Sequence, residues 1–254
     1  MTSSLPLVLC LSGHDPTGGA GLQADIEAVR GCGAYALGII TAATVQDTSN
    51  VRRVVATDCA LIEEQLDYLT RDCDIAAIKI GLIGGAAQIP LIANWLQHLR
   101  KPVVLDPVLR AGGGTDLATA ELILAIKTQL FPWVTLLTPN AAEARRLTET
   151  GSLEEAGEEL AQHCRHVLIT GGDESGSCVT NLWCRQEKPV KIYEWPRLPE
   201  TFHGAGCTLA AACAGLLARE LPISEVIEQG QRYTQQSLQK AVAIGRGRRI
   251  PGRP

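Results

Sequence analysis

The sequence lacks several patterns that would assign a function at once. Its nine cysteines include no C-x-x-C pair, which excludes the usual zinc spacing and argues against a disulfide framework. No G-x-x-x-x-G-K-[ST] segment occurs, so a P-loop nucleotide site is excluded. No apolar run approaches the roughly 20 residues of a membrane span, and no basic segment precedes the apolar run near the N-terminus. We therefore expect a cytoplasmic protein that does not contact a membrane.

The chain also has little excess charge of either sign. A net charge of -4 over 254 residues gives no electrostatic reason to expect a nucleic acid as partner. Hydrophobic residues (46%) and charged residues (20%) occur in proportions typical of globular proteins. Only 245-GRGRRIPGRP-254 is basic. At this length one α/β domain is more common than two, so we expect a single domain over 1–254, with 245–254 as a flexible, solvated tail.

Short apolar runs alternate with longer segments of helical period. Strands are predicted at 7–12, 36–45, 51–56, 75–81, 103–106, 134–138, 166–170, 178–184 and 190–195. Helices are predicted at 20–31, 59–70, 86–99, 117–129, 140–148, 153–163, 206–219 and 223–242. This alternation indicates an α/β fold with a mostly parallel sheet covered by helices on both faces. The three consecutive strands from 166 to 195 break the alternation and predict an antiparallel edge.

In such a sheet ligands bind beyond the carboxyl ends of the strands, so the loops there are the candidate sites. The first, 12-SGHDPTGGAGLQAD-25, superficially contains a dinucleotide fingerprint, but its glycines stand too far beyond the strand for that interpretation. The loop is either a glycine-rich turn that caps a helix or a place where a ligand approaches the backbone. In the second case Asp15 and Asp25 offer hydrogen-bond acceptors.

The stretch 203-HGAGCT-208 precedes an alanine-rich segment with a helical pattern. Its two glycines indicate a nest of backbone N–H groups at a helix start, where the dipole favours an anion. A glycine turn before a buried helix would have a similar sequence. Cys207 would lie in the first helical turn, where a lowered pKa makes its thiolate available as a base or a nucleophile. Cys213, deeper in the apolar part, is predicted to belong to the core.

Three further polar residues follow predicted strands. Asn140 and Glu143 stand three residues apart at a predicted helix start. They form either a capping box or part of a site for hydrated magnesium beside phosphates. Asp106 ends a buried strand, where a carboxylate is costly unless it is paired, and this favours a functional role.

Seven segments, taken in order, resemble the hydroxymethylpyrimidine/phosphomethylpyrimidine kinases of thiamine biosynthesis. They are SGHDPTGGAGLQADI, TAATVQDTSNV, IKIGLIG, VVLDPVLRAGGG, LLTPNAAEA, LITGGD and FHGAGCTLAAA. The resemblance covers essentially the whole chain and implies a ribokinase-like, doubly wound sheet. It also implies a magnesium-dependent homodimer that uses ATP to phosphorylate 4-amino-5-hydroxymethyl-2-methylpyrimidine and then its monophosphate.

The resemblance further assigns roles to individual residues. Gln46 would recognise the aminopyrimidine edge, since a carboxamide offers both a donor and an acceptor, in a pocket with Thr44, Gly13, Ala20, Asp25, Leu82 and Val108. Cys207 would accept the proton of the attacking hydroxyl, and Gly204, Ala205 and Gly206 would stabilise the transferring phosphoryl group. ATP and its phosphates would contact Asn140, Glu143, Thr170, Gly172 and Arg110, and magnesium would bind Asp106 and Glu143.

The chain departs from the family pattern at three places. Ala205 replaces a usual threonine or serine, and Thr170 replaces the lysine that commonly precedes two glycines. After Asp106-Pro107-Val108 the usual lysine and serine are replaced by 110-RAGGG-114, which makes Arg110 the candidate for a substitute cation.

Three other functions remain to be considered. The nearest is a pyridoxal-type (vitamin B6) kinase on the same fold. The second is a non-catalytic pyrimidine-binding regulatory protein, which the departures at Ala205 and Thr170 make conceivable. The third is a sugar kinase, which is disfavoured because those enzymes generally carry aspartate where Cys207 stands.

Overall fold

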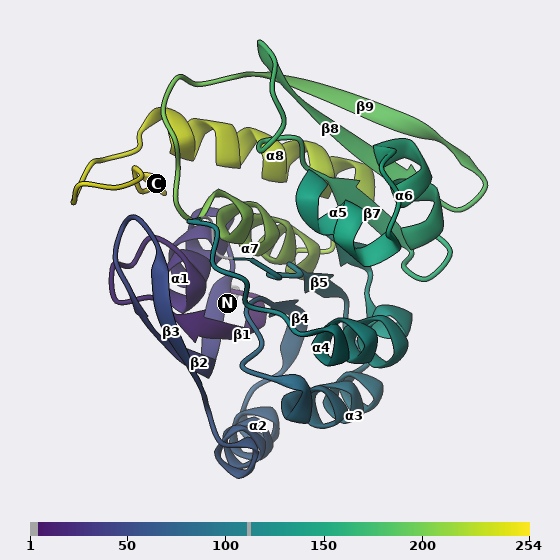
Figure 1. The fold of residues 1–254 in the computed structure, drawn as a ribbon. Coiled ribbons are helices and arrows are strands. Elements are labelled where there is room, and N and C mark those ends of the chain that lie inside the picture. The colour runs from purple at the N-terminus through teal and green to yellow at the C-terminus, as the bar shows by residue number, and fades with distance from the viewer. Residues whose placement is uncertain (1–4, 111–112) are drawn as a thin grey trace.

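A computed structural model describes residues 5–110 and 113–254 (Figure 1). Within these residues nine strands form one sheet, in the order β3-β2-β1-β4-β5-β6-β7-β8-β9. The strands are β1 (Leu7–His14), β2 (Tyr35–Gln46), β3 (Val51–Ala56), β4 (Ile75–Ile80), β5 (Val103–Leu105), β6 (Leu136–Leu137), β7 (His166–Ile169), β8 (Cys178–Arg185) and β9 (Lys188–Pro196). β2 and β3 lie on one side of β1, and the strands from β4 onward lie on the other side. The sheet is therefore doubly wound, and the order in which its strands are added reverses beside β1.

The sheet is parallel in its centre and antiparallel at both edges. β2, β1, β4, β5, β6 and β7 are parallel to one another. β8 and β9 form the antiparallel edge that the sequence predicted, and the fold class is confirmed. The direction of β3 was not predicted. It is antiparallel to β2, because the connection 47–50 is far too short for the crossover that a parallel neighbour needs.

The helices lie close to their predicted positions. They are α1 (Gly21–Gly31), α2 (Cys59–Asp72), α3 (Ile89–Leu99), α4 (Ala120–Ala125), α5 (Ala141–Thr148), α6 (Leu153–Leu160), α7 (Ala205–Ala218) and α8 (Ile223–Gln239). The predicted helix 86–99 is divided into a 3-10 turn, η1 (Ala86–Gln88), and α3, which has proline in its first turn. The predicted helix 117–129 begins later and continues as a π turn, η2 (Ile126–Leu130), and a 3-10 turn, η3 (Phe131–Trp133).

Each face of the sheet has its own layer of helices and its own apolar cluster. α2, α3, α4, α5 and α6 pack on one face, and α1, α7 and α8 on the other. Figure 1 shows α7 between α1 and α8, and every residue of α7 from Thr208 to Ala218 is buried. Small side chains allow this close packing, since Gly230 of α8 lies against Cys213 of α7. Cys213 is therefore a core residue, as predicted. None of the helices in the described parts of the chain has the length and the apolar character that a membrane crossing requires.

The basic segment 245–254, predicted as a solvated tail, instead packs against the protein. Arg249 bridges to Phe202 and Ile250 bridges to Val242, which fixes the backbone on both sides. The side chain of Ile250 is only 7% exposed. The segment thus returns to the edge of the first loop and of the stretch that precedes α7.

Arg253 anchors this segment. Its side chain is fully buried, and its guanidinium donates to Glu27 and to the Thr208 hydroxyl, both at 2.9 Å, and to the Gly19 carbonyl. The prediction of a tail relied on basic composition alone. It is corrected because the buried Arg253 guanidinium finds acceptors that offset its loss of hydration, whereas Arg246 and Arg249 on the same segment remain exposed.

Replacing Arg253 by alanine is expected to lower the free energy of unfolding by about 2–4 kcal/mol, because several charge-assisted hydrogen bonds are lost together. Arg246→Ala is the matched control, since Arg246 is exposed on the same segment and its loss should change stability by less than about 0.5 kcal/mol. Urea denaturation followed by circular dichroism measures both. Equal stabilities of the two variants would contradict the anchoring role.

Candidate active site

A cavity of about 690 Å³ lies at the carboxyl ends of the parallel strands. Segments that follow β1, β2, β4, β5, β6 and β7 line it, together with the start of α7. This is the position at which doubly wound sheets bind ligands. The structure brings together in this cavity every predicted site residue except Asp25, namely Gly13, Ala20, Thr44, Gln46, Leu82, Asp106, Val108, Arg110, Asn140, Glu143, Thr170, Gly172, Gly204, Ala205, Gly206 and Cys207.

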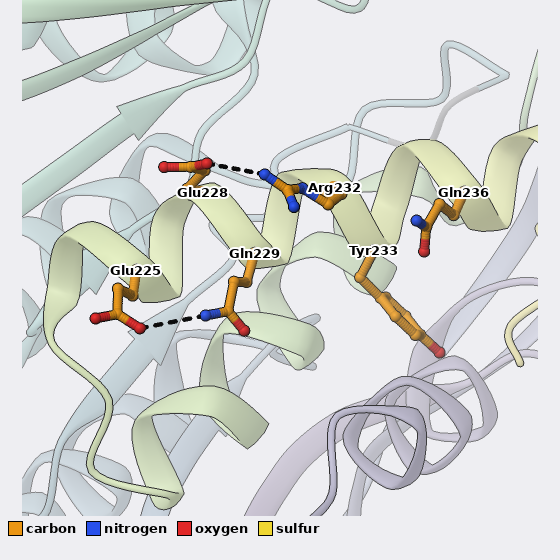
Figure 2. A pocket seen from close by; sticks show the side chains of 6 residues that line it. All are labelled: Glu225, Glu228, Gln229, Arg232, Tyr233 and Gln236. Atoms are coloured by element: carbon orange, nitrogen blue, oxygen red, sulfur yellow. Dashed lines mark hydrogen bonds and ion pairs between the residues drawn. The ribbon is translucent and has the colours of Figure 1, made fainter.

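A second depression, of about 350 Å³, lies on the exposed side of α8 (Figure 2). Its side chains pair with one another one helical turn apart. Gln229 donates to Glu225 at 3.3 Å, and Arg232 donates to Glu228 at 2.9 Å. None of the predicted site residues lies there, and this pairing accounts for four of its six lining side chains.

The start of α7 forms a wall of the cavity that carries free backbone donors. Gly204 has a φ of 86°, and a Cβ at this position would collide with the carbonyl of Gly19, so only glycine fits. α7 begins at Ala205 and no described side chain caps it. The N–H groups of its first turn therefore lack intrahelical partners and lie at the cavity, where an anion can accept from them.

Cys207 lies in this first turn, as predicted, but its thiol is not acidic. Burial and repulsion by Asp106 raise the pKa of Cys207 to about 12, despite the opposing effects of Lys79 and of the Gly21 N–H. The predicted lowering of this pKa is therefore wrong, because desolvation outweighs the helix dipole. Asp106 is the carboxylate whose charge acts most strongly on this thiol, so it is a candidate acceptor for the Cys207 proton.

Asp25 belongs to a buried ion pair rather than to the cavity wall. It is fully buried in α1, and the ammonium of Lys79 lies 2.8 Å from one of its oxygens and donates to the other at 2.9 Å. Lys79 also donates to Ser12 at 3.1 Å, and Ser12 donates to Asp25. The prediction that Asp25 contacts substrate is corrected, because its buried carboxylate is paired with the Lys79 ammonium and does not line the cavity.

Lys79 was missed from the sequence, although its setting is unusual. It is the one charged residue in the apolar strand 75-IAAIKI-80, and its side chain is fully buried. Burial acts to lower the pKa of Lys79, but attraction to Asp25, Cys207 and Asp106 raises it overall. A lone lysine inside a buried strand is the signal that could have identified it.

Asn140 and Glu143 form the predicted capping box at the start of α5. The side chain of Asn140 accepts from the Glu143 N–H at 2.8 Å, and the side chain of Glu143 accepts from the Asn140 N–H at 3.0 Å. The other carboxyl oxygen of Glu143 accepts from the Leu109 N–H at 3.2 Å. Burial and repulsion by Asp106 nevertheless raise the pKa of Glu143 to about 8.

These two carboxyl groups partly fit a divalent cation. Within residues 5–110 and 113–254, no group of three or more His, Cys, Asp or Glu side chains could hold a metal ion. A cation beside Asp106 and Glu143 would therefore need oxygen ligands from a bound phosphate, as magnesium commonly has. The raised pKa of Glu143 agrees with such a site, because a cation would remove the repulsion between the carboxyl groups.

Gln46 and Thr44 form the polar edge of the predicted pyrimidine pocket. The Gln46 carboxamide donates to the Thr44 hydroxyl at 2.7 Å, and that hydroxyl donates to the His14 carbonyl at 2.8 Å. One amide N–H of Gln46 is thereby used to fix its orientation. Its carbonyl oxygen and second N–H remain as the acceptor and donor that an aminopyrimidine edge requires.

A buried pair, Asp15 and His203, joins the first loop to the stretch before α7. The Nε2 of His203 lies 2.7 Å from the Asp15 carboxylate, which also accepts from the Thr17 and Ala20 N–H groups at 2.8 and 2.9 Å. Burial acts to raise the pKa of Asp15, but the hydrogen bonds from His203 and Thr17 lower it overall. Both residues stand in loops that the sequence indicated, but their pairing could not be predicted.

The opposite end of the cavity, formed after β6 and β7, contains Asp173 and Arg197, and the guanidinium nitrogens of Arg197 are all hydrogen-bonded to the protein. Asp173 accepts from the Ala141 and Ala142 N–H groups at 3.3 and 3.1 Å and so occupies the start of α5. Arg197, which the sequence did not indicate, donates to the Gly172 carbonyl at 2.9 Å and to three neighbouring carbonyls. It therefore shapes the glycine turn after Thr170 and has its donors in use.

Arg110 lines the cavity, but its guanidinium contacts its own loop. Its Nε donates to the Gly114 carbonyl at 2.8 Å, and its backbone bridges to Asp116. Residues 111–112 of the predicted departure lie outside the described part of the chain. Arg110 thus stands at the predicted place, with one of its donors already bound.

Comparison with known proteins gives consistent results. The sequence model of the phosphomethylpyrimidine kinase family matches residues 15–251. Over 251 residues the chain is 32% identical to the hydroxymethylpyrimidine/phosphomethylpyrimidine kinase of Rhizobium meliloti, covering 95% of this chain and 94% of that protein. It is 33% identical over 255 residues to the thiamine biosynthesis multifunctional protein ThiED of Corynebacterium glutamicum, covering 96% of this chain. The chain spans 33% of the length of ThiED.

Solved structures share the fold. A pyridoxal kinase of Bacillus subtilis in complex with ADP superposes with a TM-score of 0.90 at 26% identity, covering 98% of each chain. A phosphomethylpyrimidine kinase of Clostridium difficile superposes with a TM-score of 0.80 at 28% identity, covering 92% of this chain and 99% of that one.

The pH dependence of alkylation tests the state of Cys207. Only a thiolate reacts with iodoacetamide, so with a pKa of about 12 labelling of Cys207 should accelerate about tenfold per pH unit between about pH 7 and pH 10. Peptide mass spectrometry would follow the rate, with a Cys207→Ser variant as the control for peptide assignment. A rate that levels off below about pH 9 would show that the helix start, rather than burial, sets this pKa.

Proposed function

This chain belongs to the phosphomethylpyrimidine kinase family, and we propose that it phosphorylates 4-amino-5-hydroxymethyl-2-methylpyrimidine with ATP and then phosphorylates the monophosphate. The observation that supports this most directly is the shared cavity. It holds a fixed carboxamide, Gln46, and the anion-binding start of α7 that carries Cys207.

The pyrimidine would occupy the end of the cavity next to β1 and β2. Gln46 would pair with its amino group and ring nitrogen, with Thr44 holding the carboxamide in place. Gly13, Leu82 and Val108 would cover the ring with backbone and apolar side chains, and Ala20 would border it. This places the hydroxymethyl group toward the start of α7.

Phosphoryl transfer would take place at that helix start. The N–H groups of the segment Gly204–Gly206 would stabilise the charge that develops on the transferring group. Cys207 would accept the hydroxyl proton at Sγ while its own proton passes to a neighbouring acceptor, for which Asp106, the carboxylate that acts most strongly on this thiol, is the candidate. This transfer needs no free thiolate, in agreement with the high pKa of the thiol.

The nucleotide would bind at the end formed by the strands β6 and β7. Asn140, Thr170, Gly172 and Arg110 line this end and would contact ATP and its phosphates. Asp106 and Glu143 would hold magnesium together with phosphate oxygens. When bound, the ion would neutralise charge on the donor phosphates.

We also propose a cytoplasmic location, a single kinase domain over 1–254 and a homodimer. Nine free cysteines support a reducing compartment, and one continuous sheet supports a single domain. The exposed apolar side chains of Ile40, Val45 and Val55 on β2 and β3 support an interface with a second copy. The net charge of -4 agrees with a small-molecule enzyme that has no nucleic acid partner.

An acceptor comparison tests the proposal. With ATP and magnesium, the hydroxymethylpyrimidine and its monophosphate should each give a phosphorylated product, with kcat/KM at least about tenfold above that for pyridoxal, because Gln46 matches an aminopyrimidine edge. The similarity to a pyridoxal kinase makes pyridoxal the necessary competitor. Product analysis by mass spectrometry decides, and a preference for pyridoxal would refute the assignment. Binding of the pyrimidine without any phosphorylated product would instead support the regulatory alternative.

Replacing Cys207 by alanine should lower kcat by about 10²–10⁴-fold, because the acceptor of the hydroxyl proton is lost. Pyrimidine binding, measured by calorimetry, should stay within about twofold of the parent value. Cys178→Ala is the control, since Cys178 is exposed and does not line the cavity. Near-normal turnover by the Cys207 variant would remove this thiol from the mechanism.

A further inference from the structure

Arg248 brings a cation to the cavity from the segment that was expected to be a solvated tail. The backbone N–H of Arg248 donates to the Thr48 carbonyl at 3.0 Å, and the N–H of Gly247 donates to the Thr48 hydroxyl at the same distance. The next residue, Arg249, bridges to Phe202. The segment is thus held on both sides of the half-buried Arg248 side chain, which lines the cavity.

The guanidinium of Arg248 is poorly satisfied by the protein. Its two terminal nitrogens donate to the carbonyls of Phe202 and Ser49, each at 3.4 Å, which is long for an N–H···O bond. Its Nε is buried and has no hydrogen-bond partner among the described residues. A buried donor of this kind usually has a partner, and an acceptor bound in the cavity that Arg248 lines would supply one.

The nearest carboxylate does not fill this need. Burial lowers the pKa of Arg248 overall, and the nearby Asp15 carboxylate opposes this by raising it. However, Asp15 already accepts from His203, Thr17 and Ala20. No hydrogen bond joins Asp15 to Arg248 in the described structure, so Arg248 retains donors for an anion.

Two other arginines that line or border the cavity have their donors engaged. Arg197 donates to four carbonyls, and Arg253 is buried between Glu27, Thr208 and the first loop. Among the described residues Arg110 uses only its Nε, on the Gly114 carbonyl, but it follows β5 and belongs to the end proposed for the nucleotide. At the acceptor end, Arg248 is the cation with the longest contacts to the protein.

We propose that Arg248 binds the phosphate of the monophosphate acceptor and so adapts the cavity to the second phosphorylation. The inference rests on the proposed function. Arg248 touches Ser49, directly beyond the Gln46 loop, and Phe202, directly before His203 and the start of α7. It therefore stands at the acceptor end, on the side opposite Asn140 and Thr170, where the nucleotide is placed.

The chemistry of the two acceptors explains why such a cation is needed. The hydroxymethylpyrimidine is neutral, whereas its monophosphate brings negative charge into a cavity that already contains Asp15, Asp106 and Glu143. A guanidinium matches two phosphate oxygens with parallel N–H groups. Arg248 offers this without displacing a strong protein contact.

Arg248→Met, which keeps the length of the side chain and removes its charge, tests the proposal. It should raise KM for the monophosphate about 10–100-fold, the effect of losing charge-assisted hydrogen bonds. The kcat/KM for the neutral pyrimidine and the KM for ATP should remain within about twofold. Arg248→Lys should fall between the parent and the methionine variant for the monophosphate only.

Arg249→Met is the matched control. Arg249 is the adjacent residue on the same segment, but its guanidinium is exposed and lies 4.0 Å from Glu200. Its loss should leave both acceptors within about twofold of the parent. Calorimetry without nucleotide, comparing the pyrimidine with its monophosphate, should show the same selective loss for Arg248→Met, and thermal denaturation should confirm that each variant folds.

Three results would overturn the inference. Equal loss for both acceptors would show that Arg248 only supports the fold, and no loss for either would show that other groups bind the phosphate. A raised KM for ATP with unchanged acceptor constants would assign Arg248 to the nucleotide. Failure of the parent protein to phosphorylate the neutral pyrimidine would refute the proposed function itself, and this is visible before any variant is compared.

Discussion

The buried charge of Lys79 is the constraint around which the cavity is arranged. An ammonium taken out of water costs several kcal/mol unless a counter-charge and further hydrogen bonds accompany it. Asp25 of α1 supplies the counter-charge at 2.8 Å, and Ser12 of β1 supplies a further partner at 3.1 Å. The pair therefore fixes α1 against β1 and β4 directly beneath the first loop. This pairing thereby helps to position the first loop, whose Gly19 carbonyl lies against Gly204.

Burial and the Asp106 carboxylate keep the Cys207 thiol protonated, and the Lys79 charge opposes them only in part. Lys79 is one positive charge facing Asp25, Asp106 and Cys207. Its ammonium already lies 2.8 and 2.9 Å from the two carboxyl oxygens of Asp25. A thiolate beside Asp106 would add a second uncompensated charge in a desolvated place. Cys207 therefore stays protonated, although it stands at a helix start where exposed thiols become acidic. In the proposed mechanism a neighbouring acceptor such as Asp106, rather than the helix dipole, would allow this thiol to relay a proton.

Features set by local sequence were predictable. The strands, the capping box of Asn140 and Glu143, and the glycine turn before Cys207 depend on residues a few positions apart, and the sequence indicated all of them. Asp25 was misassigned because its partner lies 54 positions away in β4, and no local pattern predicts that contact. The segment 245–254 was misjudged for a similar reason. Its composition suggested a solvated tail, but Arg253 binds Glu27 and the Gly19 carbonyl, which lie more than 200 positions earlier in the sequence.

One departure from the family pattern, Thr170, lies at the end of the cavity proposed for the nucleotide. At the nucleotide end a usual lysine is replaced by Thr170, and the nearby Asp173 occupies the helix-start amides of α5 with a negative charge. At the acceptor end, Arg248 has few and long contacts of its own. Arg110 remains the candidate cation for the donor phosphates, and the proposed role of Arg248 would add a cation at the acceptor end. A neutral acceptor would gain nothing from Arg248, whereas a phosphorylated one would, because its charge would otherwise face Asp106 and Glu143. The proposed role of Arg248 would therefore act on the second phosphorylation and not on the first.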